Sequence, residues 1–77
     1  FCLLDAANAT ENMLLAAHTL DYGACWVGGF LQSAVKEVLG LPENVHVVSL
    51  IPLGIADEKP EVPLRRPLED MVRWEKW

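Results

Sequence analysis

The 77-residue chain lacks the features that mark several common protein classes. It has only two cysteines, too few for a disulfide framework, and both lie in apolar runs, where a thiol behaves as a small hydrophobe. We read both as reduced, which favours a cytoplasmic location. No apolar run approaches the ~20 residues of a membrane span. The apolar start at residues 1–4 is too short for a signal peptide and has no basic residue before it.

Basic residues are scarce, with six Lys and Arg against eleven Asp and Glu and a net charge of −5. Apart from His18, none precedes Lys36. A nucleic-acid surface is therefore not expected, because phosphate binding needs a patch of Lys and Arg. Four of the six lie within residues 65–77. A metal site is not expected either, because neither His18 nor His46 has partners at metal-ligand spacing.

Apolar residues are abundant for so short a chain: 52% of the residues are hydrophobic, three are Trp, and the mean hydropathy is +0.21. A domain of this size buries only ~60% of its unfolded surface. We therefore expect a partner surface, supplied by another chain or by a further part of this one. The start at Phe1 rather than at Met fits a fragment or a processed product.

The first periodic segment predicts a helix from an N-cap at Asp5 to about Leu20. Apolar side chains recur there at steps of three and four residues and cover most of the helix surface, which is typical of a buried helix. No Gly or Pro interrupts the segment until Gly23, which suits the left-handed position after a helix.

The remaining pattern predicts a second helix over residues 30–39, ended by Gly40. A β-branched run over residues 45–51 predicts a strand buried on both faces and ended by Pro52. An acidic loop follows, and Pro67 begins a short helix at its first position. The fold class is α+β, and because one strand makes no sheet, we expect the sheet to be completed from outside these residues.

The chain is organised around residues 25–30, Cys-Trp-Val-Gly-Gly-Phe, which join the two predicted helices. Without a Cβ, the backbone N–H groups of Gly28 and Gly29 are able to lie flat against a planar ligand. The alternative is a tight turn between two packed elements, and these residues alone leave both interpretations open. No Gly-Lys-Ser/Thr follows, so the pair is not part of a phosphate-binding P-loop.

Four motifs make the chain similar to the nitroreductase family of FMN-dependent oxidoreductases, and specifically to the C-terminal half of its members. They occur in the family's order and spacing over nearly the whole chain. The motifs are Asp5 with Asn-Met-Leu-Leu-Ala-Ala at 12–17, Gly-Ala-Cys-Trp-Val-Gly-Gly-Phe at 23–30, Val-Ser-Leu-Ile-Pro-Leu-Gly at 48–54, and Arg-Arg-Pro-Leu-Glu-Asp at 65–70. Residues 1–77 are accordingly expected to be the C-terminal part of a single nitroreductase-like domain.

The resemblance implies an α/β sandwich built as a homodimer, with FMN at the dimer interface. It implies that the Gly28 N–H points toward flavin N5, the Gly29 N–H toward flavin O4, and that Arg65 holds the FMN phosphate. The full set of implied cofactor-binding residues is Trp26, Val27, Gly28, Gly29, Pro52, Leu53, Gly54, Arg65 and Arg66. No side chain is expected to act as a catalytic acid or base.

The implied activity transfers electrons in two steps, from NAD(P)H to FMN and then to a quinone, nitroaromatic or similar acceptor. The chain departs from the family at Pro63, where many members have a second basic residue, and Arg66 either replaces it or faces solvent. The family's N-terminal half, with its Arg/Ser-rich phosphate segment, is not among these residues. These departures leave open an alternative, a non-catalytic flavin-binding or dimerisation module that retains the scaffold.

Overall fold

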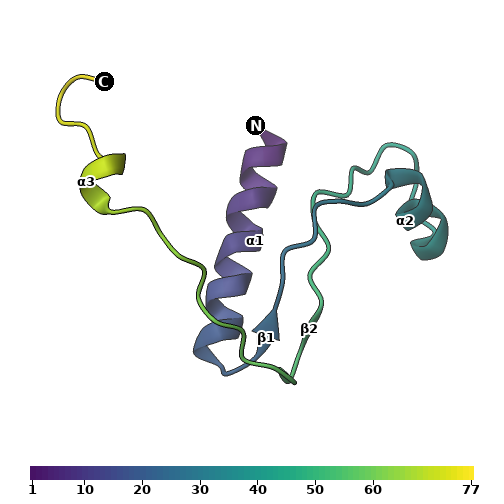
Figure 1. Ribbon diagram of the computed structural model, residues 1–77. Helices are drawn as coiled ribbons and strands as arrows, with labels where there is room; N and C mark the ends of the chain where they lie inside the picture. Colours follow the sequence, from purple (N-terminus) through teal and green to yellow (C-terminus); the bar gives the residue numbers. More distant parts are fainter.

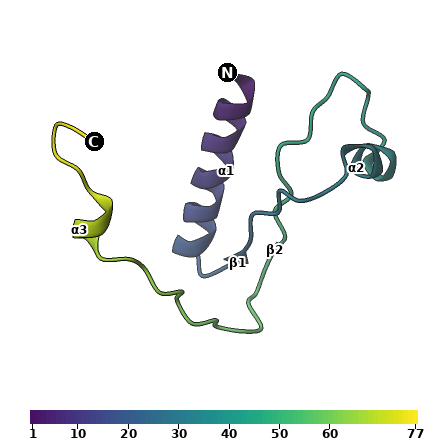
Figure 2. The same ribbon diagram turned by 45° about the horizontal axis from the view of Figure 1, so that its top comes forward.

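The computed structural model describes all residues, Phe1–Trp77, as three helices and a two-stranded sheet (Figure 1). In chain order the elements are α1 (Cys2–Thr19), β1 (Gly23–Ala24), α2 (Gln32–Leu39), β2 (Leu53–Gly54) and α3 (Leu68–Met71). The sheet and α2 lie on one side of α1, and α3 lies on the other side in both views (Figure 1 and Figure 2). The predicted mixture of helix and strand is confirmed in this partial α+β arrangement.

The helix α1 begins earlier than predicted. Its N-cap is Phe1, so the assignment of Asp5 as the cap is wrong. No Gly or Pro interrupts residues 2–4, and the Asp5 N–H already donates to the Phe1 carbonyl at 3.0 Å. Asp5 instead lies in the first turn, where its carboxylate favours the positive end of the helix dipole.

The end of α1 has the hydrogen bonds of a Schellman motif, with Asp21 in the left-handed position at φ 62°. The Asp21 N–H donates to the His18 carbonyl at 3.1 Å, and the Tyr22 N–H donates to the Ala17 carbonyl at 2.9 Å. The expectation that Gly23 takes this position is wrong. A short polar side chain tolerates the left-handed region, and Gly23 already belongs to β1.

An antiparallel ribbon of residues 23–27 and 50–54 contains β1 and β2. One register holds along it, with the partners Gly23 and Gly54, Ala24 and Leu53, and Val27 and Leu50. The last of these pairs exchanges two backbone hydrogen bonds, with N···O distances of 2.9 and 3.0 Å. Part of the sheet thus forms within the chain, and its completion from outside these residues stays a prediction.

The strand is displaced from the predicted position at residues 45–51. Most of that β-branched run has no strand neighbour within the chain, so it stays irregular and exposed or half-buried rather than buried on both faces. Pairing instead continues past Pro52, whose carbonyl accepts a hydrogen bond from the Cys25 N–H at 3.4 Å, and reaches Gly54. Proline has no N–H to return that bond, which weakens the ladder at this point.

Gly23 allows the chain after β2 to pass close to β1. A Cβ at Gly23 would lie 3.0 Å from the Ala56 Cβ and 3.4 Å from the Ala56 Cα. A side chain at this position would require Ala56 to move by a few tenths of an ångström. Gly23 is therefore a packing residue, and its lack of a side chain sets where the chain leaves the ribbon.

The other elements agree closely with the prediction. The helix α2 ends at Gly40, which takes the left-handed conformation at φ 65°. The helix α3 begins at Leu68, with Pro67 just outside it rather than at its first position. The acidic loop predicted at residues 56–63 forms no regular element, and neither do residues 64–67. We refer to residues 56–77, which end the chain, as the arm.

The interior of the chain is centred on Thr10 and Ala17, which are 3% and 8% exposed and are the only buried residues. The Thr10 hydroxyl donates to the Ala6 carbonyl at 2.8 Å. A hydroxyl has one proton, so the Ser49 hydroxyl donates to Thr10 Oγ1 across 3.0 Å. This contact joins α1 to the segment that precedes the second strand of the ribbon.

Most apolar side chains of the chain are exposed. The accessible surface is 7332 Å², whereas a compact protein of this mass exposes about 4,700 Å². The radius of gyration is 16.8 Å, against about 11 Å for a compact chain of this length. Both values support the expectation that another surface covers these side chains. None of the three helices combines the length and apolar character needed to cross a membrane.

Candidate functional site

Gly28 and Gly29, the Gly-Gly junction, directly follow the ribbon and lead to α2. Both are exposed, and neither N–H donates a hydrogen bond within the chain. A Cβ at Gly29 would meet nothing within 4 Å, and one at Gly28 would meet only the Trp26 Nε1 atom, at 4.0 Å. The junction therefore presents unpaired backbone donors to open space.

The backbone conformation does not require glycine at the junction. Gly40 is the only glycine with a positive φ, so Gly28 and Gly29 have conformations that other residues adopt. A tight turn of a type that depends on glycine is thereby excluded as the reason for this pair. Because neither residue has a side chain, a ligand is able to approach the backbone closely, as a planar ring requires. The residues present fit the flavin that the resemblance implies.

The ribbon brings most of the other predicted ring-side residues to the same place. Val27 is half-buried and paired with Leu50, immediately before the junction. The Trp26 indole is 37% exposed and borders Gly28 through its Nε1 atom. Pro52, Leu53 and Gly54 lie on the facing strand, and Leu53 and Gly54 form β2.

Two hollows flank the ribbon and carry no charged side chain. One of about 320 Å³ is lined by Gly23, Ala24, Cys25, Pro52, Leu53, Gly54, Ile55 and Ala56. The other, of about 390 Å³, lies between α1 and the ribbon and is lined by Met13, Ala16, Ala17, Leu20, Tyr22, Ile51 and Leu53. Because both are apolar, they suit packing against another apolar surface rather than acid–base chemistry.

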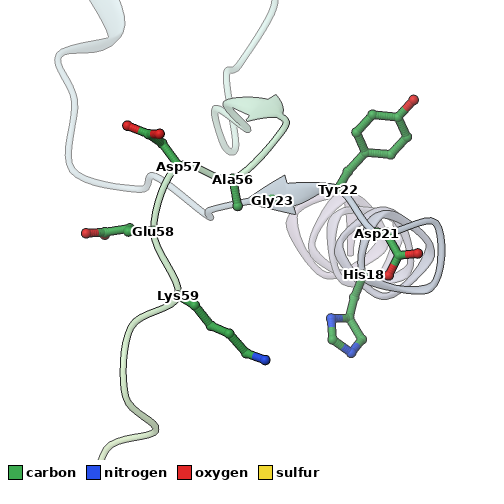
Figure 3. Close-up of a pocket in the computed structure, with 8 residues that line it drawn as sticks. All are labelled: His18, Asp21, Tyr22, Gly23, Ala56, Asp57, Glu58 and Lys59. Atoms are coloured by element: carbon green, nitrogen blue, oxygen red, sulfur yellow. The ribbon is translucent and has the colours of Figure 1, made fainter.

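The largest hollow, of about 630 Å³, lies where the arm leaves the ribbon and passes the end of α1 (Figure 3). It is lined by His18, Asp21, Tyr22, Gly23, Ala56, Asp57, Glu58 and Lys59. In Figure 3 the Lys59 side chain reaches toward His18, while Asp57 and Glu58 point away from it. No three His, Cys, Asp or Glu side chains of the chain form a group that could hold a metal ion.

Arg65 and Arg66 lie in the arm, away from the other predicted site residues. The Arg65 Nη1 donates to the Pro63 carbonyl at 3.3 Å, and the Arg66 Nη2 donates to the Asp70 carbonyl at 3.5 Å. Both side chains are exposed, with most of their donors unused. Both views place α3, which lies in the arm, and α2, which follows the Gly-Gly junction, on opposite sides of α1 (Figure 1 and Figure 2). The chain by itself thus brings the ring-side residues together but leaves the two arginines apart from them.

One residue near the site was not singled out from the sequence. The Gln32 side chain hydrogen-bonds both backbone groups of Val47: Val47 N–H donates to Gln32 Oε1 at 3.0 Å, and Gln32 Nε2 donates to the Val47 carbonyl. A glutamine at a helix start has no periodicity or spacing that distinguishes it from a solvent-exposed one. Cys2 and Cys25 are free, in agreement with the reading of both as reduced.

Comparison with known proteins agrees with the motifs. The family model described as "Nitroreductase family" matches residues 1–55. A provisionally named NADH dehydrogenase/NAD(P)H nitroreductase of Archaeoglobus fulgidus is 45% identical over 60 residues, covering 71% of this chain and 34% of that protein. The NADPH-flavin oxidoreductase of Vibrio harveyi is 41% identical over 71 residues, covering 90% and 30%. The FMN reductase (NADPH) of Bacillus subtilis is 36% identical over 69 residues, covering 79% and 27%. The chain thus spans about a third of the length of these relatives.

Proposed function

The chain belongs to the nitroreductase family, and from this premise we propose that it is part of an FMN-dependent NAD(P)H oxidoreductase. The names of relatives that match most of the chain, a NADPH-flavin oxidoreductase and a FMN reductase, support the flavin and the nicotinamide donor. The second substrate is proposed to be a quinone, nitroaromatic or similar electron acceptor. In this proposal, residues 1–77 are the C-terminal part of one sandwich domain.

The observation that carries the proposal is the Gly-Gly junction. Neither the backbone conformation nor packing within the chain accounts for glycine at both positions. Two exposed N–H groups without partners remain, directly after a ribbon that fixes where they begin. Such groups favour negative charge on whatever lies against them, and hydrogen bonds to a charged acceptor contribute about 1.5–3 kcal/mol each.

FMN, when bound, supplies the hydride and electron chemistry, and the chain supplies binding and electrostatics. Gly28 and Gly29 would donate backbone hydrogen bonds to the ring, and the residues proposed to line it are Trp26, Val27, Pro52, Leu53 and Gly54. Arg65 would hold the phosphate, because a guanidinium offers paired N–H donors that suit phosphate oxygens. Arg66 would assist it in place of the basic residue that Pro63 replaces.

We propose that the intact protein is a homodimer. The exposed apolar surface and the separation of α3 from the ribbon both support a second surface against this chain. The exposed Trp74 and Trp77 in the arm are suited to such an interface. The two free cysteines support a cytoplasmic location.

The test is to purify the intact protein, measure bound flavin by absorbance, and follow NADH and NADPH oxidation with a quinone and with a nitroaromatic. We expect FMN to co-purify or to bind on addition, and to support steady NAD(P)H oxidation. Flavin binding without oxidation would favour the non-catalytic module instead. A protein that stays colourless after addition of FMN would contradict the proposal.

A further inference from the structure

We propose that Gln32 is a positioning residue for the Gly-Gly junction, an inference that rests on the proposed flavin site. Gln32 is the first residue of α2, so the helix fixes where its side chain begins. Its carboxamide pairs with both the N–H and the carbonyl of Val47. No backbone partner satisfies those two groups of Val47, so the side chain takes the place of a strand neighbour.

This pairing changes the register of the ribbon. Val27 pairs with Leu50, and continuing that register would place residue 30 opposite residue 47. Gln32 instead reaches Val47. Residues 28–31 therefore span between two fixed points, while only residues 48 and 49 lie between the same points on the facing segment. The longer side bulges outward, as in a β-bulge, and the Gly-Gly junction is the first half of that bulge.

The bulge accounts for the unpaired N–H group of Gly29. Val27 and Leu50 form a hydrogen-bonded pair, and such pairs alternate with non-hydrogen-bonded ones along an antiparallel ladder. In a continued ladder, residue 29 would exchange hydrogen bonds with residue 48, whereas the N–H of residue 28 would point away from the facing segment. With Gln32 holding the far end, the Gly29 N–H leaves the ladder and joins the Gly28 N–H as a free donor, and no bond within the chain orients either one. Gln32 thus acts on a ligand only through the backbone that it holds in place.

A carboxamide is the side chain that this role needs. It offers one acceptor and one donor group, which match the N–H and carbonyl of a single residue. Methionine has a similar length but offers no N–H and only a weak acceptor. Glutamate keeps the acceptor but lacks the donor. These two replacements therefore separate the two halves of the contact.

The first experiment measures amide hydrogen exchange at Val47 in the intact protein. We expect protection in the wild type, retained protection in Gln32→Glu, and loss of protection in Gln32→Met. The matched control is Ser33→Ala, since Ser33 is the exposed next residue of α2 and its side chain makes no hydrogen bond. Unchanged Val47 protection in Gln32→Met would show that the contact does not hold this segment, and would overturn the proposal.

The second experiment measures the two-electron midpoint potential of the bound flavin. If Gln32 holds the backbone donors where negative charge develops on the flavin, Gln32→Met lowers the preference for reduced over oxidised flavin about tenfold. This change corresponds to a shift of the midpoint potential by ~30 mV to a more negative value. Ser33→Ala leaves the potential unchanged. A flavin-loaded Gln32→Met protein with the wild-type potential would overturn the positioning role alone. A wild-type protein that binds no flavin would overturn the proposed function and this role together.

Discussion

The ribbon and the arm differ in what holds them. In the ribbon, backbone hydrogen bonds join segments far apart in the sequence, as between Val27 and Leu50. In the arm, every hydrogen bond joins residues within four positions of each other, such as Arg65 to Pro63. All arm residues are exposed except Val72, which is half-buried.

This difference divides the proposed site into two parts. The ring-side part is shaped by the chain's own pairing before any ligand or partner is present. The phosphate-side part, with Arg65, has no contact that fixes it relative to the ribbon. Under the proposed function, we expect the arm to take its working position against another surface. We therefore expect substitutions in the two regions to have different consequences for stability and for binding.

The largest expected effect comes from a substitution that disturbs the packing where the arm leaves the ribbon. Gly23→Val places a side chain against Ala56, where a Cβ alone would lie 3.0 Å from the Ala56 Cβ. We expect a loss of up to about 3 kcal/mol in the free energy of unfolding of the intact protein, as for overpacking. Chemical denaturation measures it. Gly54→Ala is the control, because a Cβ there meets nothing within 4 Å. Equal losses in the two variants would contradict the packing role of Gly23.

The second effect comes from a substitution in the arm that is expected to weaken FMN binding without changing the free energy of unfolding. Arg65→Ala removes an exposed side chain whose only bond is to Pro63, so the free energy of unfolding changes by less than about 0.5 kcal/mol. Loss of a charge-assisted contact weakens FMN binding about tenfold to a hundredfold. Riboflavin, which has no phosphate, is the comparison ligand, and Arg73→Ala is the matched variant.

A phosphate contact at Arg65 predicts weaker binding of FMN with unchanged binding of riboflavin. Titration followed by flavin fluorescence measures both affinities. If both ligands weaken equally, Arg65 acts through the structure of the arm rather than on the phosphate. If neither weakens, Arg65 is not a ligand.

The smallest effect concerns the contact that joins α1 to the segment before the ribbon. Thr10→Val removes the hydroxyl that accepts from Ser49, and leaves a half-buried hydroxyl without its partner. We expect a loss of about 1–2 kcal/mol in the free energy of unfolding. Thr19→Val is the control, because the exposed Thr19 hydroxyl bonds only to Leu15 of its own helix. A thermal melt with equal shifts for both variants would contradict a distinct role for Thr10.

Sequence patterns predicted the features that depend on neighbours in the chain. The helix α2, predicted over residues 30–39 and found over Gln32–Leu39, follows from periodicity, and its end at Gly40 follows from the freedom of glycine at positive φ. The irregular first part of the arm, residues 56–67, follows from its prolines and acids. The start of α1 was placed too late, because Asp5 is a good N-cap residue but is equally suited to the first turn.

Features that depend on distant partners could not be read from local patterns. The β-branched run at residues 45–51 predicted a strand, but a strand requires a neighbour, and within the chain only Leu50 of that run pairs with another strand. Gly23 was assigned to the end of a helix, whereas the close approach of Ala56 explains why glycine is needed at this position. The contact between Gln32 and Val47 joins side chain to backbone across the sequence and has no pattern that announces it.

The candidate site divides in the same way. Val27 and the Gly-Gly junction were predicted together with Pro52–Gly54, and the register of the ribbon places them near one another. Arg65 and Arg66 were predicted from the resemblance alone, and their position relative to the ring-side residues remains a prediction. The order of the motifs in the sequence predicts that Arg65 and Arg66 belong to the same site as the ring-side residues. In the single chain, the exposed arm holds the two arginines away from those residues.

The most direct test of the account is Gly29→Val in the intact protein, with flavin affinity and the free energy of unfolding both measured. A Cβ at Gly29 meets nothing within 4 Å in the chain, and its φ is not left-handed. We therefore expect the free energy of unfolding to change by less than about 0.5 kcal/mol. We expect both FMN and riboflavin to bind at least about tenfold more weakly, because the valine side chain occupies the space for the flavin ring and disturbs the hydrogen bond from the Gly29 N–H to the ring. Wild-type flavin affinity in a stably folded Gly29→Val protein would contradict the central claim that the Gly-Gly junction seats the flavin ring.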